Sequence, residues 1–168
     1  MINVGRKSKD RVAVNASENI VPYRRILVPV HGTEADKRAI ELATLIGTGK
    51  NAEMVLVYVV EVAQSLPLEA DMPSEVDTGE DVLQGAERWA RQTADGRVGR
   101  ISPELLQARS AGAAIVDEAI ERGADVIVMA LCNHMRHGQP TPGETVPYVM
   151  QNAPCEVVVA RVRSGCDR

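Results

Sequence analysis

The sequence predicts an α/β fold built on a doubly wound parallel sheet of five strands, with helices on both faces. Apolar runs rich in β-branched residues are typical of strands buried on both faces of a parallel sheet. Segments with helical spacing of apolar residues alternate with these runs, a pattern that indicates strand–helix–strand units. The chain has 168 residues, 45% of them apolar, which fits one domain with a single core.

The expected elements follow one another along the chain with short links. The strands are expected at residues 25–30, 54–60, 105–108, 126–131 and 157–160. The first helix begins at Thr33, which forms with Asp36 a pattern close to a capping box, and it ends at Gly47. The later helices are expected at about 81–94, 113–122 and 144–152, the last one after a Gly/Pro-rich loop.

The chain is expected to consist of a folded domain at 23–162 and two polar tails at 1–22 and 163–168. Residues 1–11 carry a net charge of +3 in a segment too polar to fold alone, so we expect a basic, disordered amino-terminal tail. The segment 61–81 has seven acidic residues and no lysine or arginine. We interpret it as a long surface loop, either a solvated connection or a lid or docking segment for a basic partner.

Composition excludes several classes of function. One Trp, three Tyr and no Phe leave too few rings for nucleic-acid binding by base stacking. No apolar run approaches the ~18 residues of a membrane span, and no apolar segment near the start of the chain predicts a signal peptide. The three cysteines, an odd and unpatterned set, favour a reduced, cytoplasmic setting over a disulfide framework.

Four segments of the sequence resemble the universal stress protein family, and the resemblance extends over about residues 23–162. They are Arg25-Ile-Leu-Val-Pro-Val-His-Gly-Thr33, the helix and strand at 111–129, Gly143 to Val146, and Asn152-Ala-Pro-Cys-Glu-Val-Val-Val159. The resemblance implies a Rossmann-like sheet of strand order 3-2-1-4-5. It also implies a homodimer, formed through the last strand at 156–161.

Many members of this family bind ATP through a Gly-x2-Gly-x9-Gly-Ser/Thr loop after the fourth strand and an Asp after the first. This sequence keeps the spacing but has Ala130, Asn133, Gly143 and Glu144 at the loop positions, and His31 at the Asp position. The candidate residues of a degenerate nucleotide pocket are Pro29, Val30, His31, Gly32, Met54, Met129, Ala130, Asn133, Gly143, Glu144 and Thr145.

Glu144 is the strongest objection to ATP. A carboxylate ~4 Å from a phosphate is opposed by ~1 kcal/mol per charge pair in water, and by more near a protein surface. We therefore predict weak or absent ATP binding and no bound cofactor. In a structural interpretation, the Glu144 carboxylate sits at a helix amino terminus and takes the place of the missing phosphate.

A second group of residues occupies the same predicted rim of the sheet. His31, Cys132, His134 and His137 are of the types that Zn²⁺ binds, but their spacing matches no established zinc motif, so we expect no metal. We see no catalytic arrangement in the sequence and expect that the protein is not an enzyme.

The leading hypothesis is a non-enzymatic regulatory or binding protein of the universal-stress type that acts as a cytoplasmic homodimer. An ATP- or AMP-binding member of the family is the first alternative. A second alternative is a regulatory domain associated with an amino-acid permease, because residues 144–155 are similar to family members fused to such permeases. Since no membrane span is expected in this chain, it would be either a separate companion of such a transporter or a fragment of one.

Overall fold

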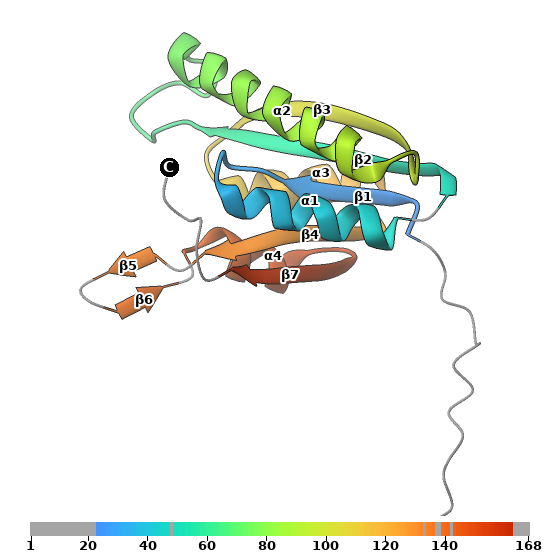
Figure 1. Ribbon diagram of the computed structural model, residues 1–168. Helices are drawn as coiled ribbons and strands as arrows, with labels where there is room; N and C mark the ends of the chain where they lie inside the picture. The colour runs from blue at the N-terminus through green and yellow to red at the C-terminus, as the bar shows by residue number, and fades with distance from the viewer. Residues whose placement is uncertain (1–22, 48, 133, 137–138, 142, 163–168) are drawn as a thin grey trace, which may run out of the picture.

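The computed structural model describes residues 23–47, 49–132, 134–136, 139–141 and 143–162, so both predicted tails lie outside the described residues. Strands and helices alternate along the chain (Figure 1). The elements are β1 (Arg25–Pro29), α1 (Glu34–Ile46), β2 (Gly49–Glu61), α2 (Pro73–Ala94), β3 (Val98–Ala108), α3 (Ala111–Arg122), β4 (Val126–Cys132), β5 (His134–Arg136), β6 (Gln139–Thr141), α4 (Thr145–Asn152) and β7 (Glu156–Val162).

The main sheet has five parallel strands in the order β3-β2-β1-β4-β7. This is the predicted order 3-2-1-4-5, with β7 as the fifth strand. The order reverses between β1 and β4, which are neighbours, and at such a point ligands bind outside the carboxyl ends of the strands.

Helices cover both faces of the sheet, as predicted. Helices α1 and α2 pack together on one face, and α3 and α4 pack together on the other (Figure 1). Apolar strand residues point alternately to the two faces, so Ile26 and Val28 belong to the core under α1 and α2, whereas Leu27 belongs to the core under α3 and α4. No helix among the described residues is long and apolar enough to cross a membrane.

Several predicted boundaries were wrong: β2 begins at Gly49 rather than at residue 54, and β3 begins at Val98 rather than at residue 105. Helix α2 begins at Pro73 rather than near residue 81. Proline is favoured in the first turn of a helix, and Glu75 there faces the positive end of the helix dipole. Gly79, which resembled a loop signal, is buried in α2 where a Cβ would lie 2.7 Å from the Tyr58 ring. The Gly/Pro-rich loop contains a two-stranded hairpin, β5 and β6.

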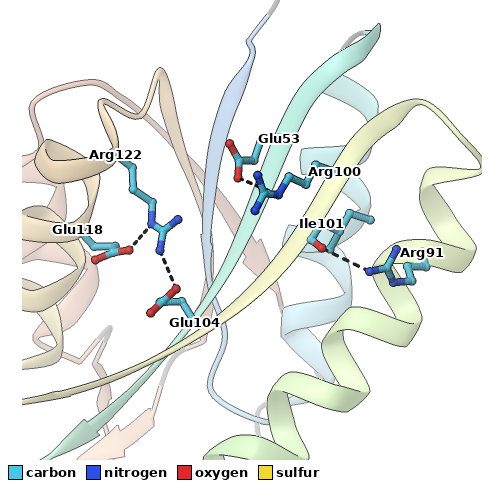
Figure 2. Close-up of polar contacts among 7 residues, drawn as sticks. All are labelled: Glu53, Arg91, Arg100, Ile101, Glu104, Glu118 and Arg122. Carbon is cyan, nitrogen blue, oxygen red and sulfur yellow. Dashed lines mark hydrogen bonds and ion pairs between the residues drawn. The ribbon is translucent and has the colours of Figure 1, made fainter.

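An arginine network surrounds the carboxyl end of α3. Arg122, in the last turn of α3, forms an ion pair with Glu118, one turn earlier in the same helix (Figure 2). It also forms an ion pair with Glu104 of β3, at 2.6 Å. Figure 2 also shows Arg100 of β3 beside Glu53 of β2, at 3.6 Å. The hydrogen bond that Arg122 donates to Glu118 raises the pKa of Arg122, against the opposing effect of burial.

Asp125 belongs to the same network, just after α3. Its carboxylate accepts the backbone N–H groups of Arg24 and Arg25, at 3.0 and 2.8 Å, and pairs with the Arg25 guanidinium at 3.4 Å. Burial raises the pKa of Asp125, but these hydrogen bonds and the arginine charge outweigh burial and lower it. Asp125 therefore ties the start of β1 to the turn that precedes β4.

Candidate functional site

A cavity of about 260 Å³ opens at the carboxyl edge of the sheet, at the point where the strand order reverses. Strands β1, β2 and β4 form its floor, and the amino-terminal ends of α1, α3 and α4 form its rim. The floor is apolar, with Val30, Val57 and Met129 buried in it. Three carboxylates stand around it, from Asp36, Glu61 and Glu144.

The structure brings most of the predicted pocket residues to this cavity. The predicted residues that line it are Pro29, Val30, His31, Met129, Ala130, Gly143, Glu144 and Thr145. Gly32 lies in the adjoining turn with a φ of 84°. Met54 was wrongly placed: it is fully buried beside Ile26, close to where β1 begins, and does not reach the cavity. Asn133 lies outside the described residues.

Asp36 fills the turn between β1 and α1 with its own carboxylate. One oxygen, Oδ2, accepts the backbone N–H groups of His31, Gly32 and Thr33 at 2.8, 2.8 and 3.0 Å. The other oxygen accepts the Thr33 hydroxyl at 3.2 Å. Three converging N–H groups at a helix amino terminus form a site of the kind that binds anions. In this chain the anion is already part of the protein.

Glu61 plays the same part at the amino terminus of α3. It is the last residue of β2, and its Oε1 accepts the backbone N–H of Ala111, the first residue of α3, at 2.7 Å. The first N–H groups of a helix have no partner within it, and a carboxylate there also faces the positive end of the dipole. The Ser110 hydroxyl accepts a further N–H, from Ala113 at 3.5 Å.

Glu144 does not follow the structural interpretation given above. It is the N-cap residue of α4, but its side chain makes no capping hydrogen bond, and the residue is exposed at the cavity rim. Gly143 before it has a φ of 73°, a left-handed conformation that glycine adopts without strain. Ala130 lies within β4 and is not left-handed, so its methyl group carries no backbone penalty.

The candidate metal ligands are not gathered into a site by the described residues. His31 stacks on Tyr58 with ring centroids 6.3 Å apart, and Cys132 is disulfide-bonded rather than a free thiol. The side chain of His134 and the whole of His137 lie outside the described residues. Groups of three or more metal-binding side chains are absent from the described part of the chain. Cys155 is a free thiol, and burial raises its pKa.

The acidic segment 61–81 borders this edge of the sheet and is held by Gln107 of β3 and by Arg109, which follows the strand. The Arg109 guanidinium donates to the carbonyl oxygens of Val62, Ala63 and Leu66, the last at 2.7 Å. Gln107 donates to two further carbonyl oxygens of the segment. All seven carboxylates are in exposed residues, and the ion pairs found among the described residues use none of them.

Sequence reasoning missed the roles of Asp36 and Glu61 in this cavity. Asp36 was assigned only to the capping box, which the structure confirms, and Glu61 was counted only as surface charge. Glu61 ends a strand and Ala111 begins a helix fifty residues later. Because the carboxyl ends of parallel strands share one edge with the amino termini of the helices that follow, this pairing was open to prediction.

Comparisons with known proteins agree with this architecture. The model of the universal stress protein family matches residues 22–161. A universal stress protein of Methanocaldococcus jannaschii is 26% identical over 154 residues, covering 88% of this chain and 86% of that protein. The structure of a universal stress protein from Archaeoglobus fulgidus superimposes with a TM-score of 0.65 at 19% identity, covering 82% of this chain and 98% of that one. The crystal structure of a universal stress protein in complex with cAMP superimposes with a TM-score of 0.61 at 18% identity, covering 83% of this chain and 98% of that one.

Proposed function

Because the chain belongs to the universal stress protein family, we propose that it is a non-enzymatic binding protein that acts as a homodimer and binds ATP weakly or not at all. The observation that supports this most strongly is the state of the cavity's anion-binding groups. The N–H groups of His31, Gly32 and Thr33 are occupied by Asp36, and that of Ala111 is occupied by Glu61.

A nucleoside triphosphate does not fit this charge arrangement. Its phosphates would find the N–H groups of the β1–α1 turn and of Ala111 already occupied, and they would face the carboxylates of Asp36, Glu61 and Glu144. At ~4 Å each charge pair is opposed by ~1 kcal/mol in water and by ~4 kcal/mol at an effective dielectric constant near 20. Lysine and arginine are missing from the cavity-lining residues that the structure describes, so no described positive charge offsets this repulsion.

The same contacts support a role in binding rather than catalysis. Asp36 and Glu61 accept backbone N–H groups that hold the β1–α1 turn and the start of α3, which is a structural role. The hydroxyl of Thr33 donates to Asp36 within the capping turn. The described cavity residues thus stabilise one another instead of presenting an activated nucleophile.

Strand β7 supports the homodimer. It ends the sheet beside β4, so its other edge carries backbone N–H and C=O groups that no described strand pairs. Val157, Val158 and Val159 are only partly buried there. Pairing of two such edges would satisfy the backbone groups and cover the valines. We expect a dimer by light scattering, and a monomer after Val158→Pro, because proline removes a backbone donor and fits poorly into a paired strand.

Titration calorimetry with MgATP tests the proposed ATP affinity. We expect no saturable heat with the wild-type chain, and a measurable affinity or a thermal stabilisation in Glu144→Ser. Glu80→Gln, at an exposed position of α2, is the matched control for the loss of one negative charge. Ligand at ~100 times its dissociation constant adds roughly 2.7 kcal/mol of stability, so a shift of that size in the wild type would contradict the proposal.

A second candidate is a member of the family that binds an adenine nucleotide with fewer phosphates. The neighbour crystallised with cAMP favours it, as does the apolar cavity floor together with the left-handed Gly143. The same calorimetry with AMP and cAMP separates the two candidates, because only the second predicts saturable heat with these ligands.

A further inference from the structure

We propose that the cavity binds an organic cation: a ligand with an uncharged, largely apolar body and a protonated amine at its polar end. The inference names the ligand class of the cavity described above and therefore rests on the proposed function. It follows from the negative charge around the cavity, which repels a phosphate ester and attracts a cation.

The floor of the cavity fixes which end of a ligand points outward. Val30, Val57, Ile115 and Met129 are each at most 4% exposed and present only apolar side-chain atoms. Burying an unpaired polar group against such a floor costs roughly 1–3 kcal/mol, and burying a charge costs more. A charged group on the ligand therefore lies at the mouth, where the carboxylates are.

At the mouth, two carboxylates on opposite elements retain capacity for a cation. Glu61 uses Oε1 for the Ala111 N–H, and no contact in the described part of the chain uses its Oε2. The Glu144 side chain makes no capping hydrogen bond, and its carboxylate forms no ion pair with any residue that the structure describes. Both residues line the cavity, and both are exposed, so an ammonium group can reach them.

Asp36 contributes charge without competing for the ligand's donors. Its carboxylate is saturated by three N–H groups and one hydroxyl, so it keeps the rim negative but has little capacity for a further hydrogen bond. An anion at the mouth would be repelled by all three carboxylates, a neutral group would gain little, and an amine would be attracted. The structure thus favours the amine among the three.

A series of ligands with one body and different charge tests the proposal. Adenosine, 5′-amino-5′-deoxyadenosine and AMP share the same base and sugar, and at neutral pH they are neutral, cationic and anionic in that order. We expect the amine to bind roughly three- to tenfold more tightly than adenosine, and adenosine at least about threefold more tightly than AMP, from one or two partly solvated charge pairs. Calorimetry at low and at raised salt measures the dissociation constants, and added salt should reduce the differences.

Variants assign that preference to the two carboxylates. In Glu61→Gln/Glu144→Gln the amide oxygen at position 61 can still accept the Ala111 N–H, and the amine should bind within about twofold of adenosine once the attraction is removed. Glu80→Gln should leave the ranking unchanged. Urea unfolding of each variant verifies that the fold is retained.

The outcomes distinguish failure of the organic-cation proposal from failure of the proposed binding function. AMP binding more tightly than the amine would overturn the cationic ligand while leaving a binding cavity in place. An amine preference that survives in the double variant would overturn it as well, because the two carboxylates would then not be its source. If none of the three ligands binds, the organic-cation proposal and the second candidate function are both contradicted, whereas the proposed absence of ATP binding still stands.

Discussion

The two ends of helix α3 contain similar numbers of acidic side chains but use them differently. At its carboxyl end, Glu104 and Glu118 pair with Arg122 (Figure 2). Asp125, just after the helix, pairs with Arg25. At its amino end, Glu61 accepts a backbone N–H, and neither Asp36 nor Glu144 forms an ion pair within the described residues. The first end is neutralised by arginines, and the second keeps its negative charge.

The helix dipole explains part of this difference. A positive side chain such as Arg122 is stabilised near a helix carboxyl terminus, and a carboxylate such as Glu61 is stabilised near an amino terminus. In an anion-binding protein, the amino terminus would be left for the ligand. Acidic residues therefore stabilise the structure at both ends of α3, but only at the amino end do they also line a cavity.

The largest effect is expected at the carboxyl end, from Arg122→Leu. This change leaves the buried Glu118 carboxylate without its charged partner, which should lower the free energy of unfolding by about 2–3 kcal/mol, less than for a fully buried pair because Arg122 is one-third exposed. Urea unfolding measures the loss. The double variant Arg122→Leu/Glu118→Leu should recover most of it, and equal instability in the two variants would show that packing by the arginine stem, not charge, is lost.

Asp36→Ala should have the next largest effect, at the amino-end cavity. Three N–H groups lose their acceptor, and the unfolding free energy should fall by about 1–2 kcal/mol, as for the loss of a helix cap. The vacated N–H groups should then accept an external anion. We expect inorganic phosphate to stabilise Asp36→Ala in a thermal melt more than it stabilises the wild type. Equal stabilisation of the two proteins would contradict this account of the turn.

Asp125 gives the network a dependence on pH. Because its pKa is lowered in the folded protein from 3.8, its contribution is complete above that unfolded value and is lost as the pH falls through the lower folded value. Asp125→Asn should cost about 1 kcal/mol at neutral pH, the value of a hydrogen bond to a partly exposed group. Urea midpoints of both proteins measured from about pH 6 to about pH 3 should converge at the acidic end. A constant gap would refute the assignment.

The smallest effect is expected from Arg100→Gln, in the outer pair of the arginine network. The Arg100 side chain is 74% exposed and lies 3.6 Å from Glu53, so solvent screens the pair. The unfolding free energy should change by about 0.5 kcal/mol or less. A loss as large as that of Arg122→Leu would mean that the network acts as one unit rather than as one strong and one weak pair.

Local patterns were enough to predict most of the fold. Continuous β-branched runs indicated strands buried on two faces, and the order of the five strands agrees with the resemblance to a known family. The Thr33–Asp36 capping box was also predicted correctly. Errors arose where a residue type that usually indicates a loop is needed instead for packing between distant elements. Gly79 indicated a loop by its type, yet it lies inside α2 because only a glycine lets the helix approach the Tyr58 ring.

For the candidate site, the sequence predicted the strand ends but not the contacts between them. Residues such as Val30, Met129 and Gly143 were assigned from their places after strands, and the structure gathers them around one cavity. Met54 was assigned to the same place and is instead buried near the beginning of β1, because strand register, which a single sequence does not show, sets the depth of a residue in the sheet.

The sequence by itself determined the alternation of elements, the family and the local excess of negative charge, because each of these depends on residue type and spacing along the chain. Only the tertiary structure decided how that charge is used. The Glu61 carboxylate and the Ala111 N–H are fifty residues apart, and no local rule brings them to 2.7 Å. The parallel sheet does so, by placing every strand's carboxyl end beside the amino terminus of a helix, where a carboxylate of the protein can occupy the position that a ligand's phosphate would need.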